Sequence, residues 1–161
     1  MMKEQIQDMI RLLGEKEKVF LAFEQETELL FEAAETDGII SRMESRQELL
    51  EKACGLDQQI AGLLNGCGKD AEEAICNRSP REGLPTDLAA LYDASLRVKA
   101  VAHRTFSSNT AVQELLERQK ESILKKLEEL NRGPSAAASR YSTSMRSAAF
   151  QPLIHKEIGK A

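Results

Sequence analysis

Residues 86–131, TDLAALYDASLRVKAVAHRTFSSNTAVQELLERQKESILKKLEELN, contain the longest periodic pattern in this chain of 161 residues. Apolar side chains recur there at alternating steps of three and four, which is the spacing of a helix face that packs in a coiled coil. Pro85 precedes the pattern and Gly133-Pro134 follows it, as is typical of helix boundaries. The pattern predicts a helix over about 87–131, and the polar residues 107–110 leave open whether that helix is continuous.

This face, which we call the seam, is mostly apolar but includes three polar residues. Its positions are Leu88, Leu91, Ser95, Val98, Ala102, Phe106, Asn109, Val112, Leu116, Gln119, Ile123, Leu127 and Leu130. Polar seam residues lower the stability of a coiled coil while they specify its register.

Apolar residues at the same spacing predict two further long helices, over about 3–35 and 39–64. Helices joined by as few residues as Thr36-Asp37-Gly38 lie antiparallel. A short helix is expected over about 69–76. The predicted fold class is therefore all-α: an elongated antiparallel helical bundle or coiled coil of three long helices, which occupies residues 1–132.

The C-terminal segment differs from the rest of the chain in composition. Residues 133–161 are rich in Ser and Ala and lack a periodic apolar pattern. From Arg132 onward there are five basic side chains and one acidic one, although the whole chain has a net charge of −4. We expect a flexible basic tail that becomes ordered when it binds a partner.

Composition and charge narrow the classes of function. A chain with 42% hydrophobic, 30% charged and 4% aromatic residues is typical of a globular helical protein. Its mild acidity disfavours nucleic-acid binding. No apolar run approaches the roughly 20 residues of a membrane span, and the first residues do not resemble a secretory signal. We expect a cytoplasmic protein that neither inserts into membranes nor binds nucleic acid.

The sequence offers no pattern of residues typical of catalysis. The spacing of a phosphate-binding loop fails around Gly68-Lys69, where Asp70 replaces the required Ser or Thr. His103 has no carboxylate within four residues, as a helical metal motif requires. Paired glutamates lie among lysines, as on a solvated helix face. We therefore predict no enzymatic activity, no cofactor and no metal site.

Two interpretations of Val112, Leu116, Ile123, Leu127 and Leu130 stay open: they form the core of a helical bundle, or they bind another protein. Three helices of unequal length cannot cover one another completely, so part of the seam is expected to be an exposed apolar stripe. A partner helix would bind such a stripe through side chains spaced i, i+3, i+4 and i+7.

The stretch from Asn109 to Tyr141 resembles the end of FlgN-type flagellar export chaperones, which have a long last helix, a short polar stretch and a lone Tyr. The matching residues are Asn109, Leu115, Leu116, Gln119, Leu127, Leu130 and Tyr141. The front of the chain also resembles this family, with a long helix, a turn containing Asp37, and a second helix with Leu49-Leu50.

The resemblance implies a chaperone for type III flagellar export, which masks the C-terminal helical segments of hook–filament junction proteins and delivers them to the export gate. It implies that Tyr141 docks to the cytoplasmic domain of that gate. The implied substrate-binding residues are Asn109, Val112, Leu116, Gln119, Ile123, Leu127 and Leu130. Two alternatives stay open: a FliT-like chaperone for the filament cap, and a structural coiled-coil protein that forms homodimers along residues 87–131.

Overall fold

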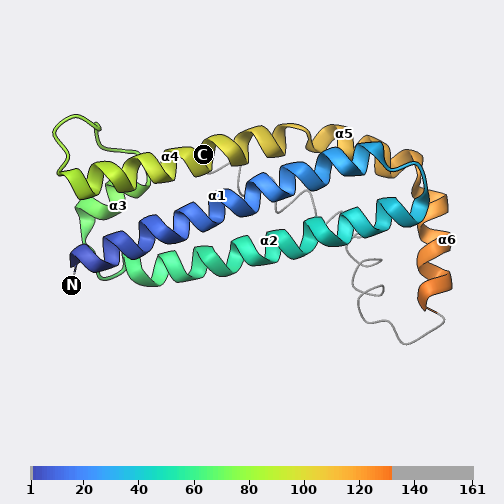
Figure 1. Ribbon diagram of the computed structural model, residues 1–161, viewed down its shortest axis with the longest axis horizontal. Coiled ribbons are helices and arrows are strands. Elements are labelled where there is room, and N and C mark those ends of the chain that lie inside the picture. The colour runs from blue at the N-terminus through green and yellow to red at the C-terminus, as the bar shows by residue number, and fades with distance from the viewer. Residues whose placement is uncertain (1, 132–161) are drawn as a thin grey trace. The chain divides into compact units, whose positions relative to one another are not determined.

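The computed structural model describes residues 2–131, and all regular secondary structure in this range is helical (Figure 1). The helices are α1 (Met2–Glu32), α2 (Thr36–Leu64), α3 (Lys69–Ile75), α4 (Thr86–Ser107), α5 (Asn109–Arg118) and α6 (Lys120–Asn131). The all-α class predicted from the sequence is confirmed. The predicted tail over 133–161, including Tyr141, lies outside the described residues.

The helix boundaries differ from the sequence prediction in two places. First, α2 begins at Thr36 rather than near residue 39, so Thr36-Asp37-Gly38 form its first turn. Asp37 suits this position because a carboxylate is favourable at the positive end of a helix dipole. Second, the segment predicted as helical over about 87–131, whose continuity through 107–110 the sequence left open, forms the three helices α4, α5 and α6, because the chain leaves the helical conformation at Ser108 and again at Gln119.

The described residues divide into two compact units, and the single helical domain over 1–132 stays a prediction. Unit 1 contains residues 2–25 and 47–105, and unit 2 contains residues 26–46 and 106–131. Helices α1 and α2 contribute residues to both units.

In unit 1, side-chain contacts agree with the helix directions that Figure 1 shows. Helix α1 runs antiparallel to α2, because Gln5 near its start accepts a hydrogen bond from Cys67, while Lys16 further along α1 pairs with the earlier residue Asp57 at 2.6 Å between Nζ and Oδ1. It runs parallel to α4, because Glu17 pairs with Arg97 and, seven residues further along both helices, Glu24 pairs with Arg104. The buried apolar residues of unit 1 are Ile6, Met9, Leu12, Leu13, Val19, Phe20, Phe23, Ala53, Leu56, Ile60, Cys67, Ala71, Ala74, Leu91, Ala94, Val98 and Val101.

Polar contacts hold α3 and the segment after it against α4. The hydroxyl of Ser95, a polar seam residue, donates a hydrogen bond to the carbonyl of Ile75. Asn77 has a backbone φ of +57° and donates through Nδ2 to the carbonyl of Tyr92 at 3.0 Å. Lys99 in turn donates to Asn77 Oδ1 at 2.8 Å. The polar position at Ser95 therefore fixes a neighbouring helix.

In unit 2, the end of α1 and the start of α2 form a hairpin with polar contacts near its base. Arg42 Nη1 lies 3.1 Å from Glu26 Oε2. Arg46 is buried and donates from Nε to Thr27 Oγ1 at 3.1 Å. Helices α5 and α6 complete this unit.

Candidate functional site

The apolar core of unit 2, which we call the tip cluster, joins the hairpin to both C-terminal helices. It consists of Leu30 from α1, Ile39, Ile40 and Met43 from α2, Val112 from α5, and Ile123 and Leu127 from α6. Ala33, Leu115 and Leu116 are partly buried and pack against it. Ile123 and Leu127 are 0% and 1% exposed, so two side chains of the short helix α6 are fully enclosed.

A sharp change of direction between α5 and α6 makes this enclosure possible (Figure 1). The Gln119 amide still donates to the carbonyl of Leu115 at 3.1 Å, and the Ile123 amide donates to the carbonyl of Gln119 at 2.9 Å. Between these two bonds lies the first turn of α6, whose amides have no acceptor within their own helix. The helix is therefore interrupted at a single residue.

The structure brings together four of the seven residues that the sequence assigns to substrate binding. Val112, Ile123 and Leu127 belong to the tip cluster, and Leu116 packs against it. Leu130 stays outside, with 43% of its surface exposed. The two polar residues of the set, Asn109 and Gln119, are half-buried; Asn109 is the first residue of α5, and Gln119 lies at the break before α6.

The prediction that this part of the seam forms an exposed stripe is wrong for Val112, Ile123 and Leu127. It assumed that a long straight helix extends beyond its shorter partners. Instead, the chain turns at Gln119 and α6 packs against the hairpin of the same unit. Ile123 and Leu127 of α6 thereby cover the apolar surface of the hairpin and are covered by it.

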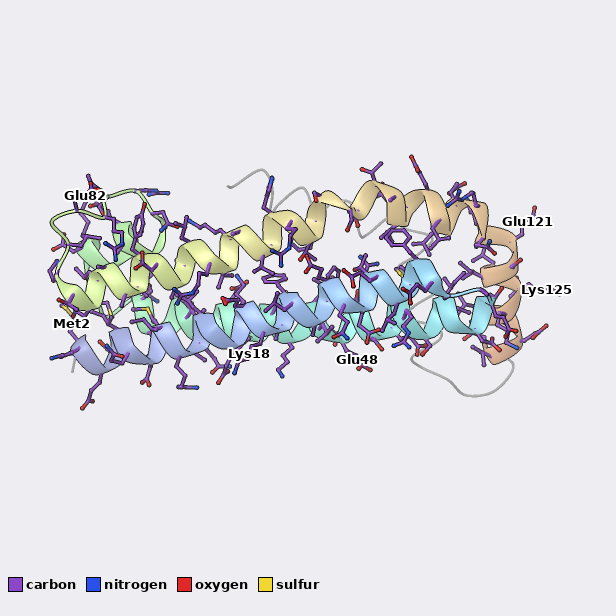
Figure 2. The ribbon with its side chains drawn as sticks, turned by 45° about the horizontal axis from the view of Figure 1, so that its top comes forward. Met2, Lys18, Glu48, Glu82, Glu121 and Lys125 are labelled. Carbon is purple, nitrogen blue, oxygen red and sulfur yellow. The ribbon has the colours of Figure 1, made fainter. Side chains whose placement is uncertain are left out.

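The outer side of α6 carries charged side chains, and Lys126 of the same helix contacts the hairpin. Lys126 Nζ lies 3.4 Å from Asp37 Oδ1 in α2 and 3.6 Å from Glu129 Oε2 in α6. Glu121 and Lys125 are exposed and lie on the outer side of α6, as Figure 2 shows. Because exposed ion pairs contribute only about 0–1 kcal/mol, the buried apolar side chains are the main contribution to the docking of α6.

Estimated energies favour the docked arrangement of α6. Burial of Ile123 and Leu127 contributes about 1.5–3 kcal/mol for each side chain, and docking also keeps Leu30 and Met43 of the hairpin covered. A continuous helix through Gln119 would add hydrogen bonds from the amides of Lys120, Glu121 and Ser122, each with a net value of about 0.5–1.5 kcal/mol. A continuous helix would therefore need another apolar surface to cover the hairpin.

Sequence reasoning missed Arg46, although a signal for it is present. Arg46 lies three residues after Met43 on the buried face of α2, so its charge interrupts an otherwise apolar spacing. It is 6% exposed and holds α2 to α1 through Thr27. A buried arginine at the base of the hairpin fixes the register of the two helices below the tip cluster.

Within residues 2–131, no three His, Cys, Asp or Glu side chains are placed so that they could hold a metal ion. In the same range, no helix is both long enough and apolar enough to span a membrane.

Comparison with known proteins identifies no relative of this chain. The chain matches no family model, no curated protein and no solved structure.

Proposed function

We propose that this protein is a cytoplasmic chaperone of type III flagellar export. It binds the C-terminal helical segments of hook–filament junction proteins, its clients, and delivers them to the export gate. The proposal combines the resemblance of residues 109–141 to FlgN-type chaperones with one structural observation. Ile123 and Leu127 fill the tip cluster as the apolar side chains of an amphipathic helix do. A surface that accepts such a helix from its own chain suits the same kind of helix from a client.

The client helix takes the place of α6 in this proposal. It packs against the hairpin residues Leu30, Ile39, Ile40 and Met43, and against the seam of the released C-terminal helix. Masking prevents aggregation of the client, because an amphipathic helix with an uncovered apolar stripe tends to aggregate.

Competition with α6 sets the affinity for the client. A client binds only molecules in which α6 has left the hairpin, so its apparent Kd is the intrinsic Kd divided by the open fraction. Each 1.4 kcal/mol that favours docking of α6 weakens the apparent affinity about tenfold. Moderate affinity suits a chaperone that has to hand its client to the export machinery.

The remaining parts of the proposal follow from the same resemblance. Holding and transfer of a helix require no bond to be made or broken, so the protein acts without a cofactor and is not an enzyme. Tyr141, outside the described residues, docks to the cytoplasmic domain of the export gate.

Titration calorimetry combined with light scattering tests the proposal. The titrant is the C-terminal helical segment of a hook–filament junction protein from the same organism, and the full chain is the receptor. We expect a one-to-one complex with a Kd in the micromolar range or below. A stable homodimer that binds no client would contradict the proposal in favour of the structural coiled coil, and tighter binding of a filament-cap segment would favour the FliT-like alternative.

A matched pair of variants locates the interaction. Leu130→Asp places a charge at a seam residue that is 43% exposed when α6 is docked, so it does not release α6 from the hairpin. It is expected to weaken client binding tenfold or more, because the client would bury an unpaired carboxylate. Ser122→Asp adds the same charge at an exposed residue of α6 outside the seam and should leave the Kd within twofold of wild type. Circular dichroism checks that both variants keep their helical content. Equal Kd values for the two variants would place the client elsewhere on the chain.

A further inference from the structure

The sequence around Gln119 favours a continuous helix, although the structure interrupts it there. Residues 109–131 contain neither Gly nor Pro, and Gln119 is followed by Lys120 and Glu121, which are good helix formers. The three- and four-residue spacing of the seam continues across the break, from Leu116 to Ile123. Local preference and observed conformation therefore disagree at this one residue.

The interruption is also small in conformational terms. Gln119 has φ −101° and ψ 5°, so a modest rotation of both angles restores the helical conformation. Helical hydrogen bonds are intact on either side, at the amides of Gln119 and Ile123. What keeps the chain bent is tertiary: the burial of Ile123 and Leu127 in the tip cluster, with the contact of Lys126 to Asp37 beside it.

We infer that residues 109–131 form a two-state switch with Gln119 as its hinge. In one state α6 is docked on the hairpin and the helix is broken. In the other, α5 and α6 form one continuous helix, Ile123 and Leu127 leave the tip cluster, and the hairpin surface is uncovered. The switch is a property of the chain alone; its role as the control of client access rests on the proposed function.

Straightening of the helix has a consequence for the binding surface. In a continuous helix, Val112, Leu116, Ile123 and Leu127 lie on one face, because they follow steps of four, seven and four residues. The same motion therefore exposes the hairpin residues and assembles the seam as one stripe. A client helix that contacts both surfaces stabilises the straight state and shifts the population toward it.

Two substitutions at the hinge push the equilibrium in opposite directions. Ala is the best residue for a helix interior and a poor N-cap, so Gln119→Ala favours the straight helix. Gly is unfavourable within a helix and acceptable as an N-cap, so Gln119→Gly favours the break. Together these preferences predict roughly a tenfold difference in the straight fraction between the two variants. Neither substitution changes a charge or a residue of the tip cluster.

Reaction of a buried thiol reports the open fraction. Leu127→Cys is introduced into the full chain with each hinge variant, and alkylation of the new thiol is followed by mass spectrometry of its peptide. When opening is fast relative to alkylation, the rate is proportional to the open population. We expect the rate to be about tenfold higher with Gln119→Ala than with Gln119→Gly. An equal rate, or a faster rate with Gly, would mean that α6 opens by local melting and would overturn the switch.

A control within α5 separates the hinge from general helix stability. Gln113 is half-buried in the middle of α5 and is helical in both states. Gln113→Ala should therefore not accelerate alkylation relative to Gln113→Gly. If this pair shows the same tenfold acceleration by Ala, the effect is not specific to the hinge and the switch is refuted.

Failure of the switch and failure of the proposed function are distinguishable. A tenfold difference in alkylation between the hinge variants, without binding of the junction-protein segment, supports the switch and contradicts the function. Binding of that segment to variants whose alkylation rates are equal supports the function and contradicts the switch.

Discussion

Three glycines of unit 1 lie inside helices, at positions 14, 55 and 62, and a methyl group added at any of them would meet no atom within 4 Å apart from the adjacent backbone of its own helix. Glycine within a helix is less favourable than alanine by about 0.5–1 kcal/mol. We expect Gly62→Ala to raise the free energy of unfolding by that amount in urea denaturation.

Gly68 provides the contrasting control, because its φ is +84°. A side chain is strained in this conformation whatever space surrounds it, so Gly68→Ala should lower the free energy of unfolding. Stabilisation by both substitutions, or by neither, would contradict this account of the backbone.

Two leucines of α6 test how its side chains contribute to unit 2. Leu127 is 1% exposed within the tip cluster, while Leu130 is 43% exposed three residues later. Leu127→Ala should reduce the stability of this unit by about 2–5 kcal/mol, as truncations in packed cores do. Leu130→Ala should change it by less than about 0.5 kcal/mol. Amide hydrogen exchange of the hairpin residues measures both effects, and a similar loss of protection in the two variants would argue against docking of α6.

At the scale of elements, the contact between Arg81 and α4 predicts a dependence on pH. Arg81 donates from Nε and Nη2 to the two carboxylate oxygens of Asp93, at 2.8 and 2.9 Å. This hydrogen bonding lowers the pKa of Asp93 below its ordinary value, and the positive charges of Arg81 and Arg97 lower it further. A carboxyl group with a lowered pKa stabilises the folded state above its unfolded pKa, and that stabilisation is lost as the pH falls through the folded pKa.

We therefore expect the segment around Arg81 to lose its contact with α4 only at a pH below about 4. In an NMR titration, the midpoint for Asp93 should lie below that of an ordinary aspartate and should rise toward it in Arg81→Gln. An unchanged midpoint in this variant would show that the contact does not persist in solution.

The sequence predicted most elements well, because their boundaries depend on local chemistry. Apolar spacing gave α1 and α3 within three residues, and Pro85 before Thr86 marked the start of α4. The Ser and Asn residues at 107–109 signalled the first break in the last segment. No residue near Gln119 signals the second break, because it results from burial of Ile123 and Leu127 against residues far away in the sequence.

The same reason limited what could be predicted of the site. The seam correctly identified Val112, Leu116, Ile123 and Leu127 as residues that share one apolar environment. Their spacing carries no information on whether that environment is a partner protein or the chain's own hairpin. In the structure described, this environment is the chain's own hairpin, and the proposed client would have to compete with α6 for it.

At the scale of the whole molecule, the two units differ in what the proposed binding requires of them. Unit 1 has ion pairs and a large apolar core that require nothing from a client. In unit 2, by contrast, two side chains of α6 complete the core. Under the proposed function, we therefore expect the packing within unit 1 to stay unchanged when a client binds to unit 2.

Methyl NMR of the full chain during titration with the junction-protein segment reports on the hairpin and on α6 at the same time. We expect the methyl signals of Leu30, Ile39, Ile40 and Met43 to shift, together with those of Ile123 and Leu127 as α6 leaves the hairpin. Leu21 and Leu96, which are exposed in unit 1, serve as the reference and should keep their positions. Shifts confined to these two leucines, or no shift at any client concentration, would contradict a client site at the tip cluster.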